Sequence, residues 1–340
     1  MVTFFNLESA PDFTAVSRLI DSIREWAMAK ILVTGGAGFI GSHIVDQFKA
    51  EQHDVVVIDD LSSGRKENIS ASTALRVLDI RSSEAREFLK QYRPDLVVHT
   101  AAQISVRKSM EDPKFDTDVN VVGLVNLLQA CMGEHGGDNK LSPMWIFLST
   151  GGAIYGEQDQ YPAPETHPQR PASIYGQAKR VGEIYLEFWA REFGLQYCAL
   201  RLANVYGPRQ NPHGEAGVVA IFIKKLLARE VPTINGSGEQ TRDFVYVMDV
   251  AMAVKAAFDR KVTGIFNIGT ATETSVNQLY DILGDSVGQK VSPNRVAAKF
   301  GEQMRSCIDP SRATKELGWR PTRSISQGLK ETCEWFSKNS

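Results

Sequence analysis

The sequence has few of the features that mark disulfide-bonded, zinc-binding or membrane proteins. It has 4 cysteines in 340 residues, and none of them forms a C-x-x-C pair or a zinc-ligand spacing. Scattered cysteines are typical of a reduced cytoplasmic protein. No apolar run approaches the roughly 20 residues of a membrane span, and the N-terminus lacks the basic start and apolar core of a signal peptide. We therefore expect a cytoplasmic protein without a membrane segment.

The chain also lacks an excess of positive charge. Its 38 Lys and Arg residues stand against 40 Asp and Glu residues, which gives a formal net charge of -2. No overall field would therefore attract nucleic acid or an anionic membrane. Hydrophobic residues make up 43% and charged residues 23% of the chain, as in an ordinary globular protein. An anionic ligand would have to be held by local groups.

Strand-like apolar runs alternate with helical stretches from residue 30 onward. The runs span residues 31–34, 55–59, 75–78, 96–99, 145–149 and 197–202. The segments between them are amphipathic or rich in alanine, as in 42–50, 82–92, 119–132 and 174–193. Continuous apolar runs are buried on both faces, as in a parallel sheet covered by helices. The pattern predicts a doubly wound α/β domain of the Rossmann type.

The alternation loosens after about residue 205, where Gly and Pro cluster in 206–217 and 231–238. We expect a larger α/β domain over 28–204, completed by 245–270, and a smaller C-terminal α/β domain from 205–244 and 271–340. Residues 1–27 form an N-terminal extension to which we assign no chemistry. The extension is either a short packing helix or the product of a start codon placed upstream of Met28.

A glycine-rich segment directly follows the first predicted strand. Gly35, Gly38 and Gly41 have the spacing G-x-x-G-x-x-G, and the first helix opens at Phe39-Ile40. Glycines allow a tight turn and a close backbone approach to a pyrophosphate, which then meets the helix N-terminus. Because a strand precedes the glycines and a helix follows them, the segment predicts a dinucleotide site rather than a plain tight turn.

Asp59 ends the second strand 18 residues beyond Gly41. A carboxylate at this place accepts hydrogen bonds from the adenosine ribose and repels a 2′-phosphate, so it favours NAD. Arg65 and Lys66 in the next loop leave NADP as the alternative. Further cofactor contacts are expected where the third and fourth strands end, from Asp79, Ile80, Ala101 and Ala102.

Tyr175 and Lys179 lie four residues apart on one face of a predicted helix. Ser149 and Thr150 end the fifth strand, at the carboxyl edge of the sheet. A free tyrosine has a pKa of about 10, and a nearby ammonium, together with the positive nicotinamide of the cofactor, would lower it and favour the phenolate. The Thr150 hydroxyl could then share and orient the proton of a substrate. Tyr-x-x-x-Lys alone is common, but together with the glycine turn it predicts a catalytic site.

With these motifs in place, the sequence resembles the extended short-chain dehydrogenase/reductases, and within them the NAD-dependent epimerase/dehydratase family. The resemblance covers roughly residues 29–338. It rests on 34–41, 99–102, Asn120 with Gly123, 149–156, 175–179, 200–207, 241–249 and 317–319. It implies a tightly held NAD, nucleotide-diphosphate-sugar substrates, and a smaller domain that binds the nucleotide sugar.

Carried onto the matching positions, the resemblance implies a role for each catalytic candidate. Tyr175 would be the base, Lys179 the partner of the ribose and of the tyrosine, and Thr150 the assisting hydroxyl. Ser149 is adjacent and could take the role of Thr150, because the glycines at 151 and 152 leave the alignment open by one residue.

The resemblance also implies substrate contacts. Asn204 and Arg242 would contact the phosphates, and Thr233 and Asn235 would lie near the uracil. Lys299 and Glu302 stand where the family has Arg-Pro-Gly-Glu/Asp, and lysine keeps the charge but not the bidentate fork of arginine. Ser306 replaces the bulky tyrosine of glucose epimerases, which would leave room for an N-acetyl group.

Several reactions of this family begin with a hydride leaving carbon 4 of the sugar. The 4,6-dehydratases have an Asp-Glu pair after the catalytic threonine, whereas this chain has Gly151-Gly152. Without an added acid and base, we expect the 4-keto intermediate to turn over and take the hydride back on its other face. The prediction is therefore 4-epimerisation of UDP-glucose and UDP-galactose, extending to the N-acetylhexosamine pair.

Three alternatives stay open. UDP-glucuronate is one, because Arg209 and His213 follow Asn204, although a solvated loop is the simpler interpretation of those two. Another NDP-sugar dehydratase or a reductase with exchangeable NADP is the second. A non-catalytic NAD-dependent regulator is the third, and the presence of Thr150, Tyr175 and Lys179 argues against it. The broad apolar stripe of helix 174–193 predicts a homodimer.

Overall fold

The computed structural model describes residues 28–339 apart from 133–139, 214–216, 290 and 299–302. The extension 1–27 and two of the predicted substrate residues, Lys299 and Glu302, lie outside the described residues.

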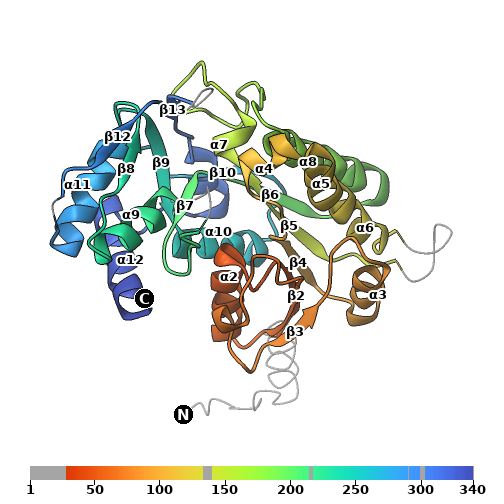
Figure 1. Cartoon of the computed structure of the whole chain (residues 1–340). Helices are drawn as coiled ribbons and strands as arrows, with labels where there is room; N and C mark the ends of the chain where they lie inside the picture. Colours follow the sequence, from red (N-terminus) through yellow and green to blue (C-terminus); the bar gives the residue numbers. More distant parts are fainter. Residues whose placement is uncertain (1–27, 133–139, 214–216, 290, 299–302, 340) are drawn as a thin grey trace, which may run out of the picture.

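A seven-stranded parallel sheet forms the centre of the larger part (Figure 1), with the strand order β10-β6-β5-β4-β1-β2-β3. Its strands are β1 (Lys30–Thr34), β2 (Asp54–Asp59), β3 (Ala74–Val77), β4 (Leu96–His99), β5 (Met144–Thr150), β6 (Tyr197–Leu202) and β10 (Gly264–Ile268). The strand order reverses between β1 and β4, and ligands of doubly wound sheets bind at such a switch point. The predicted fold class is confirmed.

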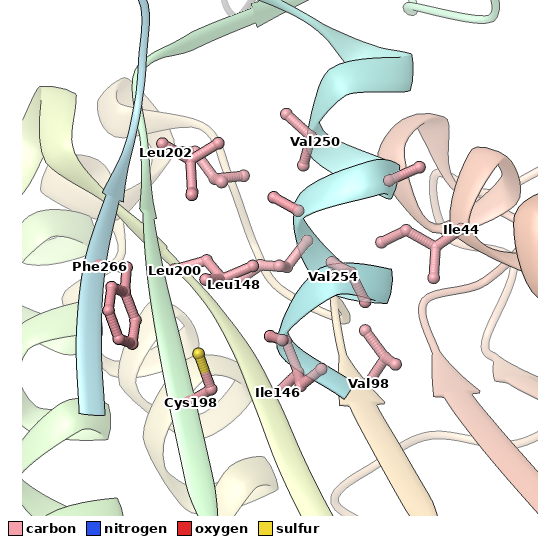
Figure 2. Packing of buried hydrophobic residues seen from close by; sticks show 14 of the residues in the cluster. Ile44, Val98, Ile146, Leu148, Cys198, Leu200, Leu202, Val250, Val254 and Phe266 are labelled. Carbon is pink, nitrogen blue, oxygen red and sulfur yellow. The ribbon is translucent and has the colours of Figure 1, made fainter. Parts of the chain in front are cut away.

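Helices cover both faces of this sheet. One face is covered by α2 (Phe39–Ala50) and α10 (Val247–Asp259), and the other by α3 (Ser83–Tyr92), α6 (Gly123–Gln129) and α8 (Ile174–Phe193). Figure 2 shows Val250 and Val254 of α10 against Leu148, Ile146 and Leu200 of the sheet, with Ile44 of α2 beside them. The predicted apolar runs are thus buried on both sides. The edge strand β3 differs, because it has a neighbour on one side only and leaves Val77 exposed.

Short helices connect the strands near their carboxyl ends. They are α4 (Val106–Glu111), α5 (Pro113–Thr117), the π-helix η2 (Asp118–Val122), α7 (Gly151–Ile154) and the 3₁₀ helix η1 (Lys66–Asn68). The segments α5, η2 and α6 follow one another without a break, so the predicted helix 119–132 begins earlier and ends at Gln129. This helical run and α4 both pack against α8.

The smaller part has its own sheet and core. Strand β9 pairs with β11 antiparallel and with β7 and β13 in parallel, and β8 pairs with β12. Its elements are β7 (Asn204–Tyr206), β8 (Thr233–Asn235), β9 (Thr241–Tyr246), β11 (Glu273–Ser275), β12 (Asn294–Val296), β13 (Arg305–Ser306), α9 (Val218–Leu227), α11 (Val276–Val287), the π-helix η3 (Ala313–Leu317) and α12 (Ile325–Asn339). Helices α9, α11 and α12 enclose an apolar cluster with β9. The predicted domain boundaries stay a prediction.

Over the described residues, no helix has the length and hydropathy needed to cross a membrane. No cluster of His, Cys, Asp and Glu that could hold a metal ion occurs in that part of the chain either. The four cysteines are buried as free thiols.

Candidate active site

A cavity of about 1080 Å³ lies where the larger and smaller parts meet. One side is lined by the start of α2, with Gly38, Phe39 and Ile40, and the other by residues of β7, α9 and α12. Thr150 at the end of β5 and Tyr175 near the start of α8 line it between these sides. The cavity therefore joins the glycine turn to the catalytic candidates at the carboxyl edge of the sheet.

The glycine turn is built so that side chains cannot be added to it. Gly35 has a φ of 70°, which favours glycine. A Cβ at Gly41 would lie 2.2 Å from the Gly35 carbonyl oxygen. The first turn of α2 carries no acidic residue, so the positive end of the helix dipole is open to an anion. The turn fits a dinucleotide pyrophosphate, with Gly38, Phe39 and Ile40 facing the cavity.

The Asp59 carboxylate supports this turn through the backbone. Its Oδ2 accepts the Ala37 amide at 2.9 Å and its Oδ1 accepts the Leu61 amide at 2.9 Å. Burial raises the pKa of this carboxyl group. Asp59 does not line the cavity, whereas Arg65 of the following loop does. The role of Asp59 as a ribose contact stays a prediction, and a role in shaping the glycine turn is added to it.

The other cofactor candidates surround the turn without lining the cavity. Asp79 forms an ion pair with Arg81, and Ile80 is buried against Gly123, where a Cβ would lie 2.6 Å from its Cδ1. Ala101 contacts the turn, because a Cβ at Gly35 would lie 2.6 Å from its amide nitrogen. The cofactor contacts of Asp79, Ile80, Ala101 and Ala102 stay predictions.

Helix α8 carries both Tyr175 and Lys179. The helix begins after Ser173, whose side chain accepts the Gly176 amide, and the Tyr175 amide donates to Ser109 Oγ at 3.1 Å. Lys179 is buried, and its Nζ donates to the Leu148 carbonyl at 3.0 Å and lies 4.8 Å from the centre of the Phe147 ring. Tyr175 therefore reaches the cavity while Lys179 stands behind it, against β5.

Burial shifts the pKa of both members of this pair in the protein without NAD. Burial raises the pKa of Tyr175, and the carboxylate of Asp116 on α5 raises it further. Burial lowers the pKa of Lys179 to about 8, against the opposing charges of Asp116 and Glu183. Burial therefore dominates the pKa of Tyr175 in the protein without NAD, and the Lys179 ammonium is directed to the Leu148 carbonyl. That Lys179 and the positive nicotinamide together lower the pKa of Tyr175 stays a prediction.

The two hydroxyls at the end of β5 have different partners. The Ser149 hydroxyl donates to Glu183 Oε1 at 2.6 Å and is thereby occupied. Thr150 Oγ1 accepts the Ala153 amide at 3.2 Å as the N-cap of α7. Since accepting this bond leaves the Thr150 proton free to be donated, the geometry favours Thr150 over Ser149 as the hydroxyl that meets a substrate.

The structure separates the predicted substrate residues into two groups. Asn204 and Arg242 line the cavity. Thr233 and Asn235 lie in β8, opposite β12, and do not line it. Ser306 is buried in β13 as the register partner of Arg242, and it does not line the cavity either. The substrate contacts of Thr233, Asn235 and Ser306 stay predictions.

Three further side chains, two cationic groups and one imidazole, line the cavity. They are Arg209, His213 and Lys224. Arg209 forms an ion pair with Asp46 of α2 at 2.7 Å, and the Lys224 ammonium lies 3.0 Å from His213 Nε2. The interpretation of Arg209 and His213 as a solvated loop stays a prediction, and both side chains line the cavity. Their position after Asn204, in the Gly- and Pro-rich loop that follows a strand end, was the signal available in the sequence.

The two glycines after Thr150 have different surroundings. A Cβ at Gly151 would lie 2.9 Å from Ile308 Cδ1, so a larger residue requires Ile308 to move. A Cβ at Gly152 would meet nothing closer than Asn204 Oδ1 at 3.5 Å. These two glycines take the positions directly after Thr150, and the carboxylate of Glu157, further along the same segment, lines the cavity.

The chain is similar to a protein family and to several solved structures. The family model of the NAD dependent epimerase/dehydratase family matches residues 31–269. The chain is similar to a UDP-glucose 4-epimerase of Thermotoga maritima with UDP-glucose, at 44% identity and a TM-score of 0.86 over 91% of this chain and 99% of that one. A UDP-glucose 4-epimerase of Thermus thermophilus in complex with NAD is 38% identical, with a TM-score of 0.85 over 92% and 100%. A UDP-N-acetylglucosamine 4-epimerase of Methanobrevibacter ruminantium in complex with UDP-N-acetylmuramic acid is 32% identical, with a TM-score of 0.85 over 92% and 99%.

Proposed function

Because the chain belongs to the NAD dependent epimerase/dehydratase family, we propose that it interconverts UDP-glucose and UDP-galactose by epimerisation at carbon 4. The observation that carries the proposal is the single cavity that joins Gly38 of the glycine turn to Thr150, Tyr175 and Asn204. A UDP-glucose complex of one similar protein and an NAD complex of another support it.

The residues of the glycine turn fit NAD as the cofactor. Its pyrophosphate would meet the N-terminus of α2 at Gly38, Phe39 and Ile40, with Asp59 holding the turn from behind. Arg65 lines the cavity beyond the turn. Its guanidinium could pair with a 2′-phosphate, so NADP is the alternative cofactor. When bound, NAD accepts a hydride from carbon 4 of the sugar and returns it.

Tyr175 is the base in this proposal. It takes the proton of the 4-hydroxyl while Thr150 donates a hydrogen bond to the same oxygen. The raised pKa of Tyr175 in the protein alone means that added positive charge is needed before the phenolate forms at neutral pH. Lys179 contributes the charge of its ammonium, which lies between α8 and β5.

The glycines after Thr150 favour epimerisation over dehydration. Elimination of water from the sugar needs an acid and a base, and Gly151 and Gly152 supply neither at the two positions directly after Thr150. The course that these glycines favour is rotation of the intermediate in the cavity and return of the hydride to its other face. The volume of about 1080 Å³ leaves space for such a rotation.

The proposal extends to the N-acetylhexosamine pair. The similarity to a UDP-N-acetylglucosamine 4-epimerase supports this extension. The small residue Ser306 was the sequence argument for it, and its position outside the cavity lining gives that argument no support. The cavity volume of about 1080 Å³ is the structural support for this extension.

A second candidate is 4-epimerisation of UDP-glucuronate. The observation that favours it is the presence of the cationic side chains of Arg209 and Lys224, with His213 beside them, in the cavity lining. A guanidinium or ammonium there would pair with the carboxylate at carbon 6 of the sugar. The same groups would also serve the diphosphate of any UDP-sugar, so the first candidate stays preferred.

Incubation of the purified protein with UDP-glucose, UDP-N-acetylglucosamine and UDP-glucuronate, followed by chromatography of the products, tests the proposal. An epimerase yields the 4-epimer with no lasting change in absorbance at 340 nm, whereas a reductase with exchangeable cofactor changes it. Tyr175→Phe should retain bound NAD and lose about 10²- to 10⁴-fold in kcat. Wild-type protein that converts none of the three sugars would refute the proposed function.

We further propose that the protein is a homodimer formed through α8. Ile184, Tyr185 and Phe188 of α8 are exposed, with Ile184 at 53%, and Met110 of the adjacent α4 is exposed as well. Such a patch on a helix pair is typical of a protein interface. The location in the cytoplasm stays a prediction, which the four free thiols support.

A further inference from the structure

A row of polar side chains crosses the large sheet directly beneath the cavity. Ser149 of β5 is the register partner of Arg201 in β6, and Arg201 is the register partner of Asn267 in β10. Side chains in register on parallel neighbours point to the same face. The three residues are 3%, 1% and 0% exposed, so the row is buried, and it borders the cavity at Ser149.

Glu183 of α8 completes this row from the helix layer. Its Oε1 accepts the Ser149 hydroxyl at 2.6 Å and Arg201 Nε at 3.0 Å. Its Oε2 accepts Arg201 Nη2 at 2.7 Å. The carboxylate thus forms a bidentate pair with the guanidinium and still holds the hydroxyl that precedes Thr150 in the chain.

The other side of the guanidinium is fixed as well. Arg201 Nη1 donates to Tyr155 Oη at 3.0 Å and to the Glu165 carbonyl at 3.1 Å. Tyr155 Oη in turn donates to Asn267 Oδ1 at 2.7 Å. One arginine therefore connects α8, the segment after α7 and the edge strand β10.

Stability alone does not explain this arrangement. Desolvating two charges costs as much as their attraction returns, so apolar residues of equal volume often serve as well. What apolar packing cannot supply is a fixed geometry, because only directional bonds with defined lengths set the rotation of a helix against a strand.

The helix carries the catalytic candidates on the same face as Glu183. Tyr175, Lys179 and Glu183 follow one another at intervals of four residues, about one turn each. The strand carries Ser149 immediately before Thr150. The bond between Glu183 and Ser149 is thus a short, buried link between the helix of the base and the strand of the assisting hydroxyl.

We propose that Glu183, Arg201 and Ser149 are positioning residues that fix the Tyr175 phenol relative to the Thr150 hydroxyl. Glu183 and Arg201 do not line the cavity, so they act through α8 and β5 and not on the substrate. The negative charge of Glu183 also raises the pKa of Lys179 against the effect of burial, which helps to keep that ammonium charged. The inference rests on the proposed catalytic roles of Thr150 and Tyr175.

A double-mutant cycle with Ser149→Ala and Glu183→Gln tests the inference on the NAD-loaded enzyme with UDP-glucose. A glutamine amide cannot accept at both of the positions that Glu183 uses, because one of its two polar ends is a donor. With its oxygen at Oε1 its NH2 group faces the Arg201 Nη2 donor, and with the amide turned over the NH2 group faces the Ser149 and Arg201 Nε donors. Displacements of about 1 Å at a catalytic group cost about 10²-fold in rate. Each single variant should therefore lose about 10- to 100-fold in kcat, with KM and bound NAD unchanged.

The double variant should lose no more kcat than the worse single variant, because both substitutions break one link. Losses that multiply would show that Ser149 acts on the substrate itself and would overturn the proposal. Single variants within twofold of wild-type kcat, or variants that change KM alone, would also overturn it.

Thr332→Val is the matched control. The Thr332 hydroxyl is buried like that of Ser149 and donates to the Gly328 carbonyl at 2.6 Å, in α12. This variant should keep kcat within twofold, which separates the loss of a link at the site from the loss of any buried hydroxyl. If Glu183→Gln fails to fold, Ser149→Ala alone still tests the inference, because it removes a neutral hydroxyl and leaves the Glu183–Arg201 ion pair intact. Wild-type protein without epimerase activity would refute the proposed function and not the positioning role.

Discussion

Replacing Lys179 with methionine should stabilise the cofactor-free protein while removing its activity. Lys179 is 3% exposed, and burial lowers its pKa from 10.5 to about 8. At 1.36 kcal/mol per pKa unit, this fall corresponds to roughly 3 kcal/mol of cost for burying the ammonium at neutral pH. Methionine of similar length removes that cost.

The substitution also removes two favourable contacts of Lys179. The hydrogen bond to the Leu148 carbonyl is worth about 1 kcal/mol, and the contact of the ammonium with the Phe147 ring is worth about 1 kcal/mol. We therefore expect Lys179→Met to raise the free energy of unfolding by about 1 kcal/mol at pH 7, which is the roughly 3 kcal/mol gain less these losses.

The higher stability of Lys179→Met relative to the wild type should disappear as the pH rises. Below the folded pKa of about 8, Lys179 is protonated in the folded and in the unfolded chain, so the full cost applies. Between about 8 and 10.5 the unfolded chain binds the proton and the folded protein does not, so wild-type stability rises with pH. The advantage of the variant should fall by about 3 kcal/mol between pH 7 and pH 10.5 and change sign.

Urea unfolding of wild-type protein and of Lys179→Met at several pH values measures this difference. Comparing the two proteins cancels the other groups that titrate at alkaline pH. Lys114→Met is the control, because the Lys114 side chain is 86% exposed on α5 and has no burial cost to lose. A difference between wild type and Lys179→Met that stays constant from pH 7 to 10.5 would refute the reasoning.

Three further predictions follow from the same structure. Gly41→Ala places a Cβ 2.2 Å from the Gly35 carbonyl oxygen and should destabilise the protein by about 1–3 kcal/mol and lower the NAD content of the purified protein; Gly152→Ala, with its nearest contact at 3.5 Å, should do neither. Burial lowers the pKa of His99 to about 3, so the unfolded chain binds the extra proton and wild-type stability should fall as pH drops from about 6.5 toward 3; His99→Gln should flatten this dependence in urea unfolding between pH 7 and 4. Ile184→Glu should convert a dimer into a monomer in light scattering, and a wild-type monomer would count against the interface on α8.

The fold could be predicted because it depends on patterns that the chain carries locally. Apolar runs such as 96–99 and 197–202 are strands in the structure at the predicted residues, since strands buried on both faces need continuous apolar sequence. The glycine turn was equally local, because the spacing of Gly35 and Gly41 follows from the close approach of their backbones. The apolar run 75–78 does not show that its strand lies at the edge of the sheet, where β3 leaves Val77 exposed.

The candidate site could be predicted only in part, because side-chain partners depend on the surroundings. Asp59 was expected to face a ribose, yet it also accepts two backbone amides of its own chain. The effect of Lys179 on Tyr175 was predicted from their spacing alone, without the burial that raises the pKa of Tyr175. Spacing places two groups on one helix face but does not give the desolvation of each.

The pair of Arg201 and Glu183 beneath the site could be suspected from the sequence but not established from residue spacing. Arg201 is the one charge in the apolar run 197–202, and a charge on a strand buried from both sides must find a partner. Glu183 continues the interval of Tyr175 and Lys179 by one more turn, so it was the candidate partner on the facing helix. Confirming the pair required the register that sets Ser149 beside Arg201, which no pattern in either segment contains. A charge inside an apolar strand, together with an opposite charge one turn beyond a catalytic motif, therefore indicates a positioning pair, and the double-mutant cycle on Ser149 and Glu183 measures whether that indication holds.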